Sequence, residues 1–318
     1  VALARALLRD LRLMMARLGG LFKRLPILIP FIWLFIFFLT PFFIVLQISF
    51  AEFQYGQPPY VPNFREVAGI GDFLDQLGMM TTYSYSILLQ DSLYWKAFLS
   101  SLRIAAVATF FALLIGYPLA YAMSRAPRSI QPILLMAVIL PFWTSYLIRI
   151  YAWKAILQKN GFLNQLLTQI GVITEPLTLL STPFAVYLGI IYTYLPFMVL
   201  PVYSSLEKID PSYSEAARDL GASGFTTFWR VIVPLSLPGV IAGCFLVFIP
   251  AMGEWVIPDL LGGSGTLMIG KQLATELFNN NDWPVAAAVA VCMIVVLILP
   301  IVVFQRVQER DQLRRQEG

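Results

Sequence analysis

Six long apolar segments dominate the chain and restrict what it can fold into. A helix needs about 20 mostly apolar residues to cross the hydrocarbon core of a bilayer. Because the backbone must satisfy its own hydrogen bonds in lipid, segments of this kind are expected to be helices. The predicted membrane spans are residues 27–49, 99–123, 131–156, 183–205, 237–260 and 284–304.

The overall composition agrees with lipid as the solvent. Hydrophobic residues make up 58% of the chain and charged residues 13%. Soluble domains contain about 45–50% apolar and about 25% charged residues. The predicted fold class is therefore an all-α membrane protein, with a six-helix transmembrane domain over residues 25–304.

Lysine and arginine are unevenly distributed among the segments that connect the spans. Cytoplasmic connections of membrane proteins are enriched in these residues. Here the enriched segments contain Arg5, Arg9, Arg12, Arg17, Lys23, Arg24, Arg125, Arg128, Lys208, Arg218, Arg230, Arg306, Arg310, Arg314 and Arg315. Both termini are therefore predicted to be cytoplasmic, whereas segments 50–98, 157–182 and 261–283 are predicted to face outward.

Three segments outside the spans have predictions of their own. Residues 1–24 alternate leucines and methionines with arginines at helical spacing, which predicts a cytoplasmic amphipathic helix on the membrane surface; a plain basic tail is the alternative. Residues 305–318 are predicted to be a cytoplasmic tail. Within 50–98, residues 73–77 and 92–95 favour short helices.

Several chemistries are excluded by residues that the chain lacks or misplaces. It contains no histidine, which the usual intramembrane zinc and Ser–His sites require. Cys244 and Cys292 lie in apolar runs without CxxC spacing and are expected to be free core residues. The phosphate-loop-like stretch 265–271 is followed by Gln272 instead of Ser or Thr. We therefore predict no catalytic site, no metal site, no bound cofactor and no nucleic-acid partner for this chain.

A spaced motif occupies the predicted cytoplasmic loop 206–234. It consists of Glu215, Ala216 and Ala217, then Gly221 three residues later, and Pro234 after a further apolar stretch. Ser212 followed by Glu215 predicts a capping box at the start of a helix, and Gly221 predicts its end with a positive φ. Two short helices joined at a glycine would form a compact projection.

This motif resembles the EAA signature of the permease subunits of bacterial ABC-type importers. Segments 140–153, 194–201, 253–263 and 279–285 are in addition similar to putrescine-importer permeases of the PotH type, within the type I importer permease family. Val231 and Val233 depart conservatively from the Ile and Leu of the signature.

The resemblance implies a complete set of partners and a mechanism. A second homologous permease would pair with this chain in the bacterial inner membrane. Two copies of a cytoplasmic ATPase would bind ATP and Mg and contact loop 206–234, and a periplasmic binding protein would deliver substrate to the side of segment 50–98. The importer would move polyamines, with putrescine as the first candidate, into the cytoplasm by alternating access. A permease for another small cationic or amino-acid-like solute, and an ion-coupled secondary transporter, are the alternatives.

Glu254 is a carboxylate inside a predicted span, with aromatic residues nearby in the sequence. A carboxylate flanked by aromatic rings can hold an ammonium group by charge and cation–π attraction. The alternative is structural: Glu254 pairs with Arg149 or caps a partner helix. For Arg149 itself we expect an ion pair or carbonyl contacts. The candidate substrate-pathway residues are Glu254, Trp255, Asp259, Tyr192, Tyr194, Trp143 and Tyr146.

Gly239 and Gly243 form a GxxxG pair in the fifth predicted span. Such pairs let the backbones of two membrane helices approach closely. We predict a tight helix contact at this position.

Overall fold

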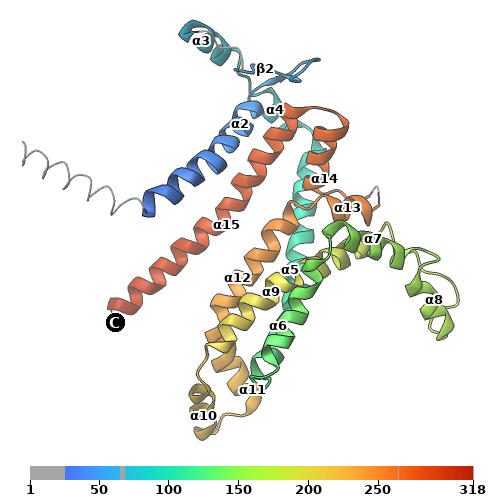
Figure 1. Cartoon of the computed structure of the whole chain (residues 1–318), viewed down its shortest axis with the longest axis vertical. Coiled ribbons are helices and arrows are strands. Elements are labelled where there is room, and N and C mark those ends of the chain that lie inside the picture. Colours follow the sequence, from blue (N-terminus) through green and yellow to red (C-terminus); the bar gives the residue numbers. More distant parts are fainter. Residues whose placement is uncertain (1–25, 65–68, 264, 318) are drawn as a thin grey trace, which may run out of the picture. The chain divides into compact units, whose positions relative to one another are not determined.

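The computed structural model describes residues 26–64, 69–263 and 265–317. The predicted surface helix over residues 1–24 lies outside these residues. The chain divides into two compact units, Val1–Tyr85 with Asp282–Val291 and Ser86–Asn281 with Cys292–Gly318. Helices make up nearly all of the regular structure (Figure 1), which confirms the all-α fold class.

The first unit begins with a long exposed helix and continues into a small irregular region. The helix covers Pro26–Ser49 and contains one π-helical turn. After it, two short antiparallel strands pair Glu52 with Val61. The Ser49 and Tyr85 hydroxyl oxygens lie 2.7 Å apart, which ties the end of this helix to the chain that follows. The elements up to the unit boundary are η1 (Phe35–Leu39), α2 (Thr40–Ser49), β1 (Glu52–Phe53), β2 (Tyr60–Val61), α3 (Ile70–Gly78) and α4 (Tyr83–Gln90).

The second unit is built around three long helices, α5 (Ser92–Arg125), α9 (Pro183–Glu207) and α12 (Val233–Met252), which pack against one another. The other elements of this part are seven short α-helices, the 3-10 helix η2 and two π-helical turns, η3 directly before α12 and η4 directly after α14. They are α6 (Gln131–Ile139), η2 (Leu140–Trp143), α7 (Tyr146–Leu157), α8 (Phe162–Gln169), α10 (Pro211–Asp219), α11 (Gly224–Thr227), η3 (Phe228–Ile232), α13 (Val256–Leu260), α14 (Ile269–Ala274) and η4 (Thr275–Asn279).

Small residues let α9 and α12 approach closely. A Cβ atom at Gly239 would lie 2.5 Å from the carbonyl oxygen of Pro201, and one at Gly243 would lie 2.8 Å from Sδ of Met198. Neither position has room for a larger side chain. The tight contact predicted from the GxxxG pair is therefore confirmed, and its partner is α9.

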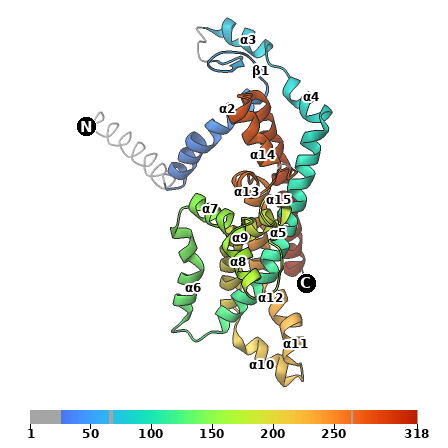
Figure 2. The same ribbon diagram turned by 90° about the vertical axis from the view of Figure 1, so that its right-hand side faces the viewer.

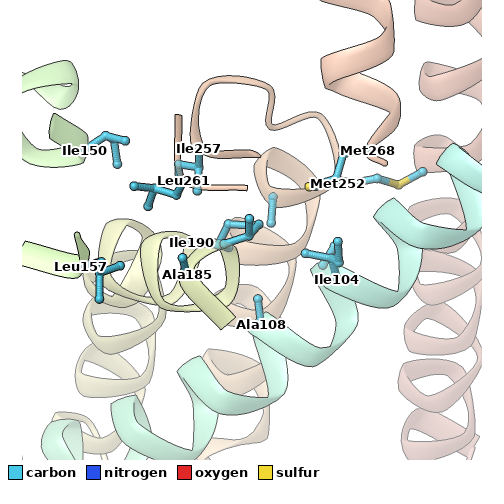
Figure 3. Close-up of a cluster of buried hydrophobic side chains, with 13 residues drawn as sticks. Ile104, Ala108, Ile150, Leu157, Ala185, Ile190, Met252, Ile257, Leu261 and Met268 are labelled. Carbon is cyan, nitrogen blue, oxygen red and sulfur yellow. The ribbon is translucent and has the colours of Figure 1, made fainter. Parts of the chain in front are cut away.

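An apolar core lies where these helices meet α7 and α13 (Figure 3). Its side chains come from segments far apart in the sequence and are almost completely buried. The labelled members are Ile104, Ala108, Ile150, Leu157, Ala185, Ile190, Met252, Ile257, Leu261 and Met268. This core fixes the position of α13 relative to α7 and α9.

The predicted spans are recovered in part, with two corrections. Among the described residues, four helices are long and apolar enough to cross a membrane: Pro26–Ser49, Ser92–Arg125, Pro183–Glu207 and Gly224–Met252. A bent helix pair accounts for a fifth predicted span. The sixth predicted span corresponds to the apolar part, Trp283–Ile298, of α15 (Trp283–Glu317). The predicted tail continues α15 to Glu317, and residues 92–95 form the first turn of α5 instead of a separate helix.

The first correction concerns the predicted span 131–156. It is broken into Gln131–Trp143 and Tyr146–Gln169, which meet at an angle of 88°. The break lies at Thr144 and Ser145, whose ψ angles of 149° and 135° are extended. The Thr144 side chain also donates a hydrogen bond of 2.7 Å to the carbonyl oxygen of Pro141, which competes with helix continuation.

The second correction concerns the predicted span 237–260. Its helix begins earlier, at Gly224, and ends at Met252, and α13 follows only after a break at residues 253–255. Within the second unit, this break lies toward the end of the bundle that carries α14, whereas α10 and α11 lie at the opposite end (Figures 1 and 2). The break and the loop that contains α10 and α11 therefore lie at opposite ends of this unit.

Candidate functional site

A cavity of about 480 Å³ lies beside the break between α12 and α13. It is bounded by η2 and α7 on one side, by α9 on another and by the break itself. The lining residues are Phe142, Tyr146, Arg149, Thr193, Tyr194, Phe197, Pro250, Gly253, Glu254, Trp255 and Val256. Aromatic and polar side chains from distant parts of the sequence are thereby brought together.

Glu254 shapes the chain at this break. Its Oε1 atom accepts hydrogen bonds from the backbone N–H groups of Trp255, Val256 and Ile257, at 3.1, 3.0 and 3.3 Å. The first N–H groups of a helix have no carbonyl partner within the helix, and here the carboxylate supplies one. Glu254 thus caps the first turn of α13, and its side chain is only 7% exposed.

Two tyrosines complete the surroundings of this carboxylate. Tyr146 on α7 donates to Oε1 at 2.8 Å, and Tyr194 on α9 donates to Oε2 at 2.6 Å. Hydrogen bonds to an ionised acceptor are stronger than those between neutral groups. Glu254 therefore connects three helices that would otherwise meet only through apolar contacts.

Arg149 lies in the same cavity but does not pair with Glu254. Its guanidinium carbon lies 5.1 Å from the ring centre of Phe142 and 5.9 Å from that of Tyr146. Its Nε atom is buried and has no hydrogen-bond partner within the described part of the chain. Among the described residues of this chain, Arg149 therefore has no ion pair, and its Nε atom makes no carbonyl contact. The capping alternative holds for Glu254, although the capped helix belongs to this chain and not to a partner.

The predicted pathway residues separate into two groups. Glu254, Trp255, Tyr194 and Tyr146 line the cavity. Trp143 does not, and its side chain is 76% exposed at the end of η2. The other two are engaged elsewhere: the Tyr192 ring packs against Trp153 at 5.3 Å, and Asp259 lies 3.5 Å from Nζ of Lys271.

Sequence reasoning missed several of the lining residues, among them Phe142, Phe197 and Thr193. Phe142 and Phe197 pack edge to face with ring centres 5.1 Å apart, and Thr193 is buried with its hydroxyl unpaired among the described residues. The signal for Phe197 was available, because it lies three residues after Tyr194 and so one helical turn along the same face. Thr193 had no such signal.

A second buried carboxylate, Glu276, lies in the predicted outward segment 261–283. It accepts hydrogen bonds from the Tyr94 hydroxyl at 3.0 Å and from the Gln272 and Asn280 side-chain amides, both at 2.7 Å. These donors come from α5, α14 and the residue after η4, so Glu276 fixes that segment to the start of α5. We assign it a structural role.

The other candidate site is loop 206–234, where α10 begins with a different cap from the one predicted. The side chain of Asp210 accepts the Ser212 N–H at 2.9 Å, and Pro211 occupies the first helical position, which needs no N–H partner. The same N–H lowers the pKa of the Asp210 carboxyl below its ordinary value. The predicted Ser212–Glu215 capping box is therefore replaced by an Asp210 cap.

The end of α10 agrees with the prediction. Gly221 has φ +84°. Its N–H donates to the Arg218 carbonyl at 2.8 Å, and the Ala222 N–H donates to the Ala217 carbonyl at 3.0 Å. This pair of bonds is the Schellman arrangement, which requires a left-handed residue at the position of Gly221.

The projection formed by α10 and α11 exposes large apolar side chains. Leu220 is 89% exposed and Phe225 75%, and Tyr213 and Trp229 are more than half exposed. Phe228, by contrast, packs edge to face against Tyr117 and Tyr121 of α5, with ring centres 5.8 and 5.3 Å apart. The projection is thus anchored to the bundle and carries an apolar surface for a partner.

The sequence and structure can be compared with those of known proteins. A family model described as "Binding-protein-dependent transport system inner membrane component" matches residues 17–314. The spermidine/putrescine transport system permease protein PotB of Escherichia coli (strain K12) is 46% identical over 228 residues, which cover 72% of this chain and 82% of that protein. PotB of Haemophilus influenzae is 40% identical over 285 residues, covering 90% and 93%.

Solved structures support the fold independently. A chain of a bacterial ABC transporter involved in the import of the acidic polysaccharide alginate matches with a TM-score of 0.64 at 18% identity, covering 92% of this chain and 99% of that one. A chain of the MetNI methionine ABC transporter matches with a TM-score of 0.53 at 17% identity, covering 68% and 94%. At these identities the similarity establishes the fold alone.

Proposed function

Because the chain belongs to the family of inner membrane components of binding-protein-dependent transport systems, we propose that it is the permease subunit of an ATP-binding-cassette importer for polyamines. Relatives at 40–46% identity carry the name spermidine/putrescine permease, which supports this substrate class. Putrescine is the substrate suggested by the sequence motifs. Both compounds are extended, flexible cations with ammonium groups at their ends.

The hydrogen bonding of Glu254 is the observation that carries the proposal. Among the described residues, its Oε1 atom accepts four protein donors, whereas Oε2 accepts only the Tyr194 hydroxyl. A carboxylate oxygen has about two acceptor positions, so Oε2 can accept one more donor. An ammonium group entering the cavity fits this position. The rings of Tyr146, Tyr194 and Trp255 offer it π faces.

This arrangement suits transport better than tight binding. Most of the acceptor capacity of Glu254 is used by groups of the protein itself, so the attraction left for an ammonium group is limited. A transported cation must leave the cavity as readily as it enters. Each change of conformation must then be driven by differences in binding energy between states, here supplied by ATP bound to other subunits.

Loop 206–234 is the proposed contact with those subunits. Its exposed Leu220, Phe225 and Trp229 side chains would dock into a groove of a cytoplasmic ATPase, two copies of which would bind ATP and Mg. A second homologous permease and a periplasmic binding protein complete the proposed importer. The chain itself carries out no covalent chemistry and holds no cofactor.

Transport by the complete importer in liposomes tests this proposal. With ATP enclosed and the binding protein outside, labelled putrescine and spermidine should accumulate saturably, each competing with the other. Uptake that follows an ion gradient without ATP would contradict the importer assignment. ATP-dependent uptake of another solute, with polyamines excluded, would retain the permease and reject the substrate class.

A further inference from the structure

The cavity built by this chain has no net formal charge. Of its described lining residues, only Glu254 and Arg149 are charged, and their charges cancel. A polyamine entering a partly dehydrated space needs negative charge to compensate its own. The cavity therefore lacks the net negative charge that a polyamine, the substrate class of the proposed function on which this inference rests, would need.

Arg149 is the group in the cavity that needs an acceptor, because a guanidinium can only donate, whereas the Thr193 hydroxyl can donate or accept. The Nε–H of Arg149 is buried and unpartnered within the described residues, and the Thr193 hydroxyl is buried without a partner as well. Glu254 does not serve Arg149: its bonds go to Tyr146, Tyr194 and the start of α13, and the remaining acceptor position of Oε2 is the one proposed for the ammonium group. A protonated polyamine offers only donors and would repel the guanidinium. The missing acceptor must come from elsewhere.

We infer that the cavity is one half of a composite site, and that the second permease subunit inserts an acidic side chain that pairs with Arg149. A carboxylate matches the planar fork of a guanidinium with two parallel hydrogen bonds. With that side chain in place, the shared cavity holds two carboxylates and one guanidinium. Its net charge becomes −1, which attracts an ammonium group.

The position of Arg149 fits this role. Contacts with the rings of Phe142 and Tyr146 hold its guanidinium in place before a partner binds. Tyr146 also donates to Glu254, so one side chain contacts both the guanidinium and the carboxylate. Pairing at Arg149 would thus be communicated to the carboxylate that meets the substrate.

The test is assembly of the complete importer containing Arg149→Met, Arg149→Lys or Lys154→Met in this chain. Lys154 is the control, since it also lies on α7 and contacts an aromatic ring, that of Tyr151, but does not line the cavity. Removing one member of a buried pair leaves the other charge uncompensated. We expect Arg149→Met to weaken pairing of the two permeases by on the order of a hundredfold, Arg149→Lys by much less, and Lys154→Met hardly at all.

A second set of variants locates the partner group. Each aspartate and glutamate within the membrane spans of the second permease is changed to its amide, alone and together with Arg149→Met. One of these changes should weaken assembly alone and partly restore it in the Arg149→Met background. This non-additivity is the signature of a direct pair.

Two outcomes would overturn the inference. In the first, Arg149→Met assembles normally and no acidic residue of the second permease is coupled to it. In the second, assembly is normal and the affinity for polyamines rises, which would make Arg149 an unpaired cation that repels substrate. The first outcome uses assembly alone, so it remains decisive even if the importer proves to carry a different solute.

Discussion

Tyr194 donates a hydrogen bond of 2.6 Å to Oε2 of Glu254 and so connects the middle of α9 to the break between α12 and α13. The carboxylate is fixed in place on its other side by the first turn of α13. Glu254 is thus a structural cap of α13, and under the proposed function it would also accept the ammonium group of the substrate.

Replacing Glu254 with glutamine should reduce polyamine uptake while preserving the fold. The amide oxygen of the glutamine can still accept the backbone N–H groups of α13, but the negative charge is gone. A hydrogen bond to a charged group contributes about 1.5–3 kcal/mol, so we expect about a 10- to 100-fold loss of uptake efficiency. The measurement is initial uptake rate against putrescine concentration in the reconstituted importer.

The controls for this change are Glu254→Ala and Asp259→Asn. Glu254→Ala removes the cap and should also lower thermal stability. Asp259→Asn removes a carboxylate that lies outside the cavity and pairs with Lys271, so uptake should remain near normal. Normal uptake by a well-assembled Glu254→Gln importer would remove Glu254 from the substrate pathway.

Changing Tyr194 to phenylalanine should lower the thermal stability of the purified chain. The change removes the one donor to Oε2 found in the described part of the chain, and a buried polar group left without its partner costs about 1–3 kcal/mol. Tyr192→Phe is the matched control, because the Tyr192 ring packs against Trp153 in both forms. Equal melting temperatures for the two variants would show that the Tyr194 bond contributes little.

The long helices and the loop motif could be predicted from local patterns, whereas the cavity could not. Gly239 and Gly243 are spaced for a helix contact, and Gly221 follows a helix that needs a left-handed residue. Local sequence patterns were therefore enough to predict the close helix contact and the turn after α10. The side-chain partners of Glu254 come from the start of α7 and the middle of α9, which lie far away along the chain. Charge alone favoured Arg149 as the partner of Glu254. In the structure, tyrosine hydroxyls and backbone N–H groups donate to the carboxylate oxygens of Glu254 instead.

The breaks in the spans were missed for a related reason. Hydropathy measures only average apolarity, and residues 144–145 and 253–255 are flanked by apolar helices on both sides. Local hydrogen bonding accompanies both breaks: Thr144 bonds to the carbonyl of Pro141 before the first, and Glu254 caps the start of α13 after the second. Thr144 and Glu254 are polar side chains inside apolar segments, and such side chains can bond to nearby backbone groups. Their presence was the signal in the sequence for these breaks.

Replacing Gly239 with alanine should loosen the contact between α9 and α12. The added Cβ would lie 2.5 Å from the Pro201 carbonyl oxygen and 2.5 Å from Cβ of Ser205, so the helices must separate. Overpacking of this kind costs about 1–3 kcal/mol, which should appear as a lower melting temperature in detergent. Gly71→Ala in α3, where a Cβ meets no atom within 4 Å, should show no such loss.

The direction of the chain in the membrane can be tested by labelling single cysteines in intact spheroplasts. The background replaces Cys244 and Cys292 with alanine. Tyr55, which is 92% exposed, lies in the segment expected outside, and Arg310 lies at the end expected inside. An impermeant maleimide should therefore label Tyr55→Cys but not Arg310→Cys until the membrane is opened. The reverse pattern would invert the proposed orientation.

Replacing Gly221 with proline should uncouple ATP hydrolysis from transport. Proline cannot adopt φ +84° and has no N–H to donate to the Arg218 carbonyl, so the turn between α10 and α11 would be lost. Leu220 and Phe225 would no longer be presented together to the ATPase, although Phe228 would still anchor the loop to α5. Membrane insertion should continue, while uptake per ATP hydrolysed falls at least about tenfold, equivalent to about 1.4 kcal/mol. Gly224→Ala provides the control, because a Cβ there meets no atom within 4 Å and the backbone is ordinary. If Gly221→Pro transports as well as Gly224→Ala, the loop is not the contact through which the ATPase acts.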